Sequence, residues 1–280
     1  MENEAAQSAQ RAIESVLSGR GHGDINAVIA TEALRRRLAP FVFLDHFDVE
    51  TSEEWGFPYH PHSGVATFTY PRTSDLRHED TGGNAGTIGK GGVQWMAAGG
   101  GLWHQELYEP DAGRVEGLQL WMLLPPDREN GPVEYQEVGA AELPRVDDTR
   151  VLAGSYGEAR SPIETPYPFN YFEVSLDGSG WSFQPPSDHD VAWLYVSEGE
   201  VRVRETTVPA GHLLVFDGSS GCLEVAAAGA ANFVVGTAAA FSHDIVFGRF
   251  SMHTSEAALQ SGLQRVRELA GGLRAAGKIG

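Results

Sequence analysis

Short apolar runs, cut at regular intervals by turn-forming residues, constrain the fold of this chain more than any other feature. After residue 24 the runs are separated by Gly, Pro, Asn and Asp at intervals of about 8 to 12 residues, a spacing typical of a β-sandwich or barrel. The 34 glycines and 15 prolines fit a chain that turns often. We therefore predict an all-β protein, with strands at 41–44, 66–70, 93–96, 118–124, 171–174, 191–196, 200–204, 212–216 and 232–235.

Two halves with a similar order of strands indicate duplication of a β unit. A Gly-led strand occurs in each half, at 91–95 and 210–215, and the strand signal weakens between them, around residues 125 to 166. We predict four segments: an N-terminal helix and tail (1–24), a first barrel (25–135), a connection (136–165), and a second barrel followed by a C-terminal helix (166–280).

Helix-forming residues gather near the two ends of the sequence. Residues 4–18 carry a weak apolar stripe that stops at Gly19 and at the breaker Gly21-His22-Gly23, which predicts a short N-terminal helix. From about Ser255 to Ala276, Ala, Leu, Gln, Arg and Glu dominate, and Ser255 is a suitable N-cap. We expect the chain to close with this helix.

Charge and cysteine content narrow the classes of function. With 20 Lys and Arg against 38 Asp and Glu, the net charge of -18 repels phosphates and anionic lipids, so we expect no direct nucleic-acid binding and no membrane binding. The basic run Arg35-Arg36-Arg37 is predicted to be a solvated stretch without a role. A single cysteine, Cys222, excludes an internal disulfide and a Cys-based zinc site. Lacking a secretory signal or an apolar run of about 18 residues, the protein is expected in the cytoplasm.

Two short pairs of residues, His60-Pro61-His62 and His104-Gln105-Glu106, carry the chemistry of the sequence. In a strand the side chains at i and i+2 leave the same face, so each pair aims both members in one direction. Brought together, three imidazoles and one carboxylate form a site for iron, zinc, copper or nickel, with one or two coordination positions open. The sequence therefore predicts a metal site formed by His60, His62, His104 and Glu106.

The other motifs point to structure more than to chemistry. Three glycines before His104, within 97–103, predict a backbone that turns tightly and approaches the metal closely. The glycine-rich stretch 81–92 fails the spacing of a phosphate-binding loop, and no Gly-x-Ser-x-Gly elbow supports a serine hydrolase. We interpret His78-Glu79-Asp80 as a turn with exposed charge, and the other unpaired histidines as structural: His22, His46, His78, His189, His212, His243 and His253.

The sequence resembles the pirin family, two-barrel proteins of the cupin superfamily. The resemblance is dense over about residues 41 to 125 and weaker beyond residue 165. Three places depart from the family pattern: Ser63 stands where Arg is common, residues 71–75 replace a hairpin that is usually of a Glu-Gly type, and Trp103 stands where a smaller apolar residue is usual. The matching stretches are 43–47, 60–64, 78–84, 93–101 with His104-Gln105-Glu106, 117–121 and, in the second half, 245–254.

The resemblance implies two cupin-type jelly-roll barrels facing each other, with one metal, usually iron, held in the N-terminal barrel by His60, His62, His104 and Glu106. Comparison of the two halves of the sequence indicates that the C-terminal barrel lacks ligands, since Asp188-His189-Asp190 stands where a histidine pair is expected and no His-x-Glu pair follows its Gly-led strand. The expected cofactor is thus one divalent transition metal, Fe(II) ahead of Zn, Cu, Ni or Mn.

For function, the family is associated with quercetin 2,3-dioxygenase activity and with regulatory binding to protein partners. We predict a metal-dependent dioxygenase that acts on a flavonol or another small aromatic substrate, with Glu106 as the catalytic base. Trp103 and Gln119 are predicted pocket contacts, Trp103 because its size would narrow the pocket. The alternative is a non-enzymatic, redox-sensing regulator that binds a protein partner, and a third reading is another cupin reaction, such as an isomerisation.

Overall fold

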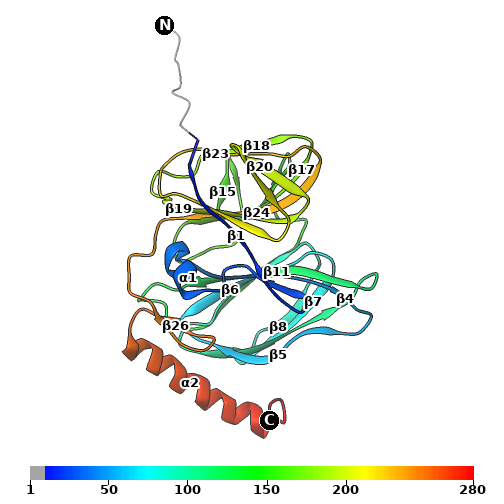
Figure 1. The fold of residues 1–280 in the computed structure, drawn as a ribbon. Helices are drawn as coiled ribbons and strands as arrows, with labels where there is room; N and C mark the ends of the chain where they lie inside the picture. Colours follow the sequence, from blue (N-terminus) through cyan, green and yellow to red (C-terminus); the bar gives the residue numbers. More distant parts are fainter. Residues whose placement is uncertain (1–9) are drawn as a thin grey trace. The chain divides into compact units, whose positions relative to one another are not determined.

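A computed structural model describes residues 10–280, and in it the chain divides into two compact units. Unit 1 contains the described residues up to Gly19, with Pro144–Ser161 and Pro168–Ala240. Unit 2 contains Arg20–Leu143, Pro162–Tyr167 and Phe241–Gly280. Strands dominate both units (Figure 1), as the turn spacing predicted.

Unit 2 is built from two antiparallel sheets. The larger has seven strands in the order β12-β9-β6-β11-β4-β3-β2, and the smaller has four in the order β5-β10-β7-β8. Apolar side chains of both sheets form one cluster, in which Phe47 of the larger sheet contacts the rings of Trp55, Phe57 and Tyr108 of the smaller. The elements of unit 2 are β2 (Arg20–His22), β3 (Ile25–Ala27), α1 (Glu32–Leu38), β4 (Phe41–Glu50), β5 (Trp55–His62), β6 (Val65–Pro71), β7 (Asp75–Asp80), β8 (Ala85–Ile88), β9 (Val93–Ala97), β10 (Leu102–Glu109), β11 (Arg114–Leu123), β12 (Glu134–Val138), β25 (Val246–Phe247), β26 (Met252–His253) and α2 (Glu256–Ala275).

Unit 1 repeats this plan. Its seven-stranded sheet has the order β1-β22-β19-β24-β17-β14-β13, and its four-stranded sheet the order β18-β23-β20-β21. The matching pair of sheets in each unit confirms the two-barrel fold expected from the sequence. The elements of unit 1 are β1 (Ile13–Ser18), β13 (Arg145–Val146), β14 (Thr149–Ala153), β15 (Ser155–Tyr156), β16 (Ala159–Arg160), β17 (Phe169–Asp177), β18 (Gly180–Phe183), β19 (Val191–Glu198), β20 (Glu200–Val203), β21 (Thr206–Pro209), β22 (His212–Phe216), β23 (Leu223–Ala226) and β24 (Ala230–Ala238).

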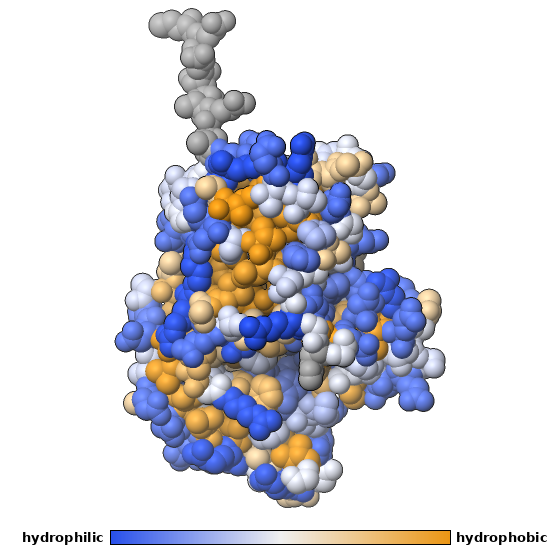
Figure 2. Space-filling view, viewed as in Figure 1, coloured by the Kyte–Doolittle hydropathy of each residue, from blue (hydrophilic) through white to orange (hydrophobic). Residues whose placement is uncertain are grey.

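One large apolar core fills unit 1 between its two sheets. It joins Phe172 and Leu194 of the larger sheet to Trp181 and Val203 of the smaller. Figure 2 shows hydrophobic residues gathered over this unit on one face, with hydrophilic residues around them. Among the described residues of unit 1, Leu17 is the one large hydrophobic residue that is exposed. Each of the other large hydrophobic residues in this area therefore shows only a small part of its surface to solvent.

The helix predicted over residues 4–18 is not found in the part of it that the structure describes. Residues 13–18 form β1 instead, which is labelled in Figure 1. Strand β1 pairs with β22 at the edge of the larger sheet of unit 1. Pairing with an open sheet edge satisfies the backbone and outweighs a weak helix preference. Residues 4–9 of the predicted helix lie outside the described residues. The helix of the N-terminal region is α1, which is capped by Thr31. Of the run predicted to be solvated, Arg36 is exposed, whereas Arg35 and Arg37 are half-buried.

The C-terminal helix agrees with its prediction. It spans Glu256–Ala275, and the Ser255 side chain accepts a hydrogen bond from the backbone N–H of Ala258 at 3.2 Å. No helix of the described chain combines the length and apolar character that a membrane span requires.

The predicted segment boundaries differ from those of the structure at three places. Residues 144–161 of the predicted connection belong to unit 1, where β14 buries Val151, Leu152 and Ala153. The helix α2, placed by the sequence with the second barrel, belongs to unit 2 and packs against β10 and β26. Strand β1, from the predicted N-terminal segment, belongs to unit 1. The prediction assigned segments to barrels in the order of the sequence. In the structure the described N-terminal residues join unit 1 and the C-terminal segment joins unit 2, and local sequence patterns do not encode such long-range packing.

Candidate metal centre

Neighbouring strands of the smaller sheet of unit 2 bring the two predicted pairs together. Strands β5 and β10 are antiparallel, and their register sets His104 directly opposite His60. Residues opposite each other in such a ladder point to the same face. His62 and Glu106, two positions further along their strands, join that face. The register shifts here, because Glu106 lies opposite Phe57, so β5 carries one extra residue between Phe57 and His60.

Three imidazoles converge at this point. The metal-binding atoms offered by His60, His62 and His104 all lie within 4.8 Å of one another. A second group with the same spacing contains His104, Glu106 and His78. His104 belongs to both groups, so the structure gathers all four predicted ligands around it and adds His78.

Hydrogen bonds to backbone carbonyls fix how two of the imidazoles present their nitrogens. Nδ1 of His62 lies 3.0 Å from the carbonyl oxygen of Phe250, and Nδ1 of His60 lies 2.9 Å from that of Pro58. Because a carbonyl only accepts, each Nδ1 carries the proton and donates it. The other nitrogen, Nε2, is left with its lone pair, as in a metal-ligating histidine held by a carbonyl.

Buried nitrogens without partners show that the site fits a metal ion. Nε2 of His62 and both ring nitrogens of His104 are buried and have no hydrogen-bond partner among the described residues. A buried polar atom without a partner costs free energy, and coordination would remove that cost. Burial, followed by the neighbouring His60, lowers the pKa of His62 to about 3. Burial and then the imidazoles around it hold the pKa of His104 well below its usual value. Both rings are therefore neutral, the form that binds a metal.

Glu106 is fully buried and held by two neutral donors. Oγ1 of Thr69 donates to one carboxylate oxygen at 2.9 Å, and Nε2 of Gln119 donates to the other at 3.2 Å. Thr69 is on β6 and Gln119 on β11, so both reach Glu106 from the larger sheet of unit 2. These bonds orient the carboxylate and leave each oxygen with a lone pair for a further partner.

A cavity of about 390 Å³ opens beside the cluster, a size that suits a small organic molecule. Gln119, a predicted pocket contact, is among the residues that line it. Most of the others are aromatic, which favours a flat, apolar ligand. The lining residues are Phe43, Asp45, Phe57, Pro58, Tyr59, His60, Glu106, Gln119, Trp121 and Phe250.

Trp103 is not one of the residues that line this cavity, contrary to the prediction. Its indole N–H donates to the carbonyl of Val266 in α2 at 2.9 Å. Neighbouring residues of a strand point to opposite faces, so a ring directly before His104 faces away from the ligand side. Trp103 therefore fastens the C-terminal helix to β10.

The glycines before His104 were predicted to let the backbone approach the metal, but the structure gives a different reason for them. Gly99 has φ of 49°, and a Cβ there would lie 2.2 Å from the carbonyl oxygen of Gly131. At Gly101 an added Cβ would meet Arg265 of α2. The tight turn is confirmed, but the close approach is to a neighbouring loop and to a helix.

His78 was missed because its triplet was interpreted as an exposed turn. Residues 75–80 form the strand β7, and His78 and Asp80 are buried, with His78 Nε2 3.1 Å from a carboxylate oxygen of Asp80. The register of β7 against β10 sets His78 opposite Glu106. Burial alternates along β7, with Glu79 half-exposed between two buried residues, but all three side chains are polar, so the triplet shows no alternation of apolar and polar residues that would have indicated a strand.

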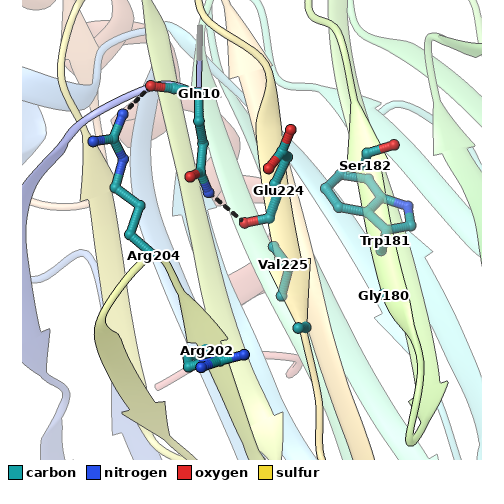
Figure 3. A pocket seen from close by; sticks show the side chains of 9 residues that line it. Gln10, Gly180, Trp181, Ser182, Arg202, Arg204, Glu224 and Val225 are labelled. Carbon is teal, nitrogen blue, oxygen red and sulfur yellow. Dashed lines mark hydrogen bonds between the residues drawn. The ribbon is translucent and has the colours of Figure 1, made fainter.

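Unit 1 offers no comparable cluster among its described residues. All groups of three potential ligands found in the described chain belong to unit 2. In unit 1, His189 is buried and its Nδ1 lies 2.9 Å from Oγ1 of Thr237. A hollow of about 400 Å³ lies instead between β18, β20 and β23, where Gln10 reaches the carbonyl of Glu224 and Arg204 bonds back to Gln10 (Figure 3).

A protein with two such barrels, one of them with buried imidazoles and a carboxylate inside, is a two-domain cupin. Comparison with known proteins narrows this class, because the family model described as Pirin matches residues 23–122. A pirin-like protein of Arabidopsis thaliana is 31% identical over 229 residues, which are 76% of this chain and 73% of that protein. The chain belongs to the pirin family.

Two further relatives agree. A pirin-like protein of Caulobacter vibrioides is 38% identical over 61% of this chain, and the match spans 65% of that protein, slightly under two thirds. The crystal structure of a quercetin 2,3-dioxygenase from Acinetobacter baumannii superposes with a TM-score of 0.84 at 27% identity, covering 91% of this chain and 96% of that one.

Proposed function

We propose that this protein is a mononuclear metal-dependent dioxygenase acting on a flavonol or a similar polyphenol, with His60, His62, His104 and Glu106 as the metal ligands. The observation that carries the proposal is the set of buried imidazole nitrogens without partners beside an aromatic cavity. The likeness to a quercetin 2,3-dioxygenase supports the choice of reaction.

The donor set suits Fe(II), the ion we expect, although nitrogen and oxygen donors also bind Zn, Cu, Ni or Mn. Bound there, a redox-active divalent ion would lower the pKa of a coordinated hydroxyl group and supply the electron chemistry that reaction with oxygen requires. The protein contributes the geometry. The carbonyls of Pro58 and Phe250 set the orientation of two imidazoles, so the ligands are in place before the ion arrives.

Glu106 is positioned to accept the proton of a substrate hydroxyl. Its carboxylate lines the cavity and is held in position by hydrogen bonds from Thr69 and Gln119. In this role the proton leaves the substrate oxygen and forms an O–H bond on the carboxylate. The rings of Phe57 and Trp121 would flank the flat substrate and exclude water from it.

Oxygen consumption tests the proposal. The protein would be loaded anaerobically with Fe(II), its metal content measured, and oxygen uptake followed with a panel of flavonols and catechols. We expect uptake with at least one compound, loss of metal and activity in His60→Ala, and no change in His243→Ala, which removes an exposed imidazole.

Full occupancy by Fe(II) without uptake for any compound would overturn the dioxygenase assignment. It would favour the alternative of a non-enzymatic regulator that binds a protein partner. Failure of the wild-type protein to bind any transition metal would overturn the ligand assignment itself.

A further inference from the structure

We propose that Asp45 is a second substrate-binding group, which accepts a hydrogen bond from a hydroxyl of the polyphenol distant from the metal ligands. The inference rests on the proposed function and deepens it, because it assigns a residue that selects substrates with more than one hydroxyl group. Asp45 lines the same cavity as His60 and Glu106.

The position of Asp45 follows from the register of three neighbouring strands. Asp45 of β4 is directly opposite Gln119 of β11, and Gln119 is directly opposite Thr69 of β6. Opposed residues share a face, so these three form a polar row across the inner face of the larger sheet of unit 2. Gln119 and Thr69 both bond Glu106, whereas Asp45 lies one strand further along the row.

Asp45, which is half-buried, differs from the buried carboxylates of unit 2 in its hydrogen bonding. Its Oδ1 is buried and has no hydrogen-bond partner among the described residues. By contrast, Asp80 accepts from the backbone N–H groups of Gly82 and Asn84 at 2.7 and 3.0 Å. Glu106 accepts from Thr69 and Gln119. A buried acceptor without a donor is costly, and here it borders a cavity, so a donor on a bound ligand would satisfy it.

The charges around Asp45 suit a neutral ligand donor. Burial raises the pKa of Asp45 to about 7, although Arg35 of α1 lowers it in part. The other titratable groups on the cavity wall are Tyr59 and His60 of β5 and Glu106 of β10. Near neutral pH the carboxyl group therefore exchanges readily between its two protonation states. The ionised form can only accept a hydrogen bond, so binding of a hydroxyl donor should strengthen as the pH rises.

The chemistry of the site defines the ligand class. One oxygen of the substrate would face the metal ligands and Glu106, and a second, protonated oxygen would face Asp45. A compound in which that second hydroxyl is methylated keeps its shape and apolar area but loses the donor. Discrimination between the two compounds therefore isolates the contribution of Asp45.

The test is a binding measurement without turnover. Quercetin and its monomethyl ethers, together with catechol and guaiacol, would be titrated anaerobically against the metal-loaded protein at pH 6 and pH 8, and dissociation constants measured by absorbance. We expect the wild-type protein to prefer one free hydroxyl over its methyl ether by about ten- to hundred-fold, the range for a hydrogen bond to a charged group. The preference should be larger at pH 8.

Two variants and one control accompany the titration. Asp45→Ala should lose the preference at both pH values, and Asp45→Asn should keep part of it without the pH dependence. Asp48→Asn is the matched control, since Asp48 is on the same strand but exposed and bonded to Arg114. Metal content and thermal unfolding would show that each variant is folded.

Each outcome decides one point. If Asp45→Ala and Asp45→Asn both keep the wild-type preference and its pH dependence, the role of Asp45 is refuted while the dioxygenase proposal stands. If the fully loaded wild-type protein binds none of these compounds, the proposed function fails and the inference falls with it.

Discussion

The hydroxyl of Thr69 orients Glu106, one of the proposed metal ligands, through a single hydrogen bond. It donates to Glu106 at 2.9 Å, and we expect Thr69→Val to weaken metal binding by about tenfold or more, as for other groups that orient a metal ligand. Competition with a coloured chelator would measure the change.

Thr67 provides a close control for Thr69. It is two positions earlier on β6 and equally buried, but its hydroxyl has no partner among the described residues. Thr67→Val should leave metal affinity unchanged. Equal losses in the two variants would mean that the hydrogen bond to Glu106 does not orient the ligand.

Asp45 also makes a prediction for stability in the metal-free protein. Its pKa in the folded state, about 7, lies above the usual value of 3.8, so between these values the folded protein binds more protons than the unfolded chain. Its contribution is fully present below pH 3.8 and is lost as the pH rises through 7. Relative to wild type, Asp45→Asn should therefore become more stable between pH 4 and pH 8, as measured by chemical denaturation. A constant difference over this range would contradict the raised pKa.

At the residue scale, the side chains that could be predicted from the sequence are those whose positions depend on local spacing along one strand. His60, His62, His104 and Glu106 could be found because i and i+2 positions share a face of a strand. Residues that reach the site through cross-strand register, Asp45 and Thr69 among them, could not, because pairing between distant strands has no local signature. Trp103 was misplaced although strand alternation already set it on the face opposite His104.

At the scale of elements, the segment after β25 connects the C-terminal helix to the metal centre. The carbonyl of Phe250 holds His62, and three residues on, His253 has its Nε2 3.0 Å from Oγ of Ser63 and its Nδ1 3.3 Å from a carboxylate oxygen of Glu129. All three members of this polar cluster are buried. Ser63, which departs from the family pattern, thus bonds the segment that leads into α2, next to the predicted ligand His62.

Two glycines of α2 test how closely the helix packs on this cluster. A Cβ at Gly262 would lie 2.5 Å from Oγ of Ser63 and 2.7 Å from Nε2 of His253, whereas at Gly271 nothing lies within 4 Å. Alanine favours a helix over glycine by about 1 kcal/mol, so Gly271→Ala should stabilise the protein by up to that amount. Gly262→Ala should instead destabilise it by about 1–3 kcal/mol, the usual range for overpacking. Thermal unfolding would measure both, and a stabilised Gly262→Ala would show that the contact is loose.

The two helix predictions differ in outcome for a physical reason. Ser255 caps a long segment of strong helix formers, and local preference and packing agree there. Residues 13–18 have helix formers as well, but the open edge at β22 offers them a full set of backbone partners. The order of residue types along the sequence does not show that β22 leaves an open sheet edge for residues 13–18.

At the scale of the whole molecule, both ends of the chain cross between the units. The described N-terminal residues complete a sheet of unit 1, while Phe241–Gly280 returns to unit 2. The strand pattern and the duplication of the barrel could be predicted, because each strand carries its own local signal. The crossing could not, because a segment that follows the second barrel in sequence gives no sign of packing on the first.

Removal of the C-terminal segment tests this assignment. A chain that ends at Ala240 keeps every segment of unit 1 but lacks Phe250, His253 and α2. The orienting bond to His62 and the cover over Ser63 disappear, so we expect metal affinity to fall by at least about tenfold, in the range found when groups that orient a metal ligand are removed. Limited proteolysis should cut unit 2 first. If the segment instead belonged to the second barrel, as sequence order suggested, proteolysis would cut unit 1 first and metal affinity would be unchanged. A chain that lacks only the last two residues serves as the control, since it retains α2 and Lys278.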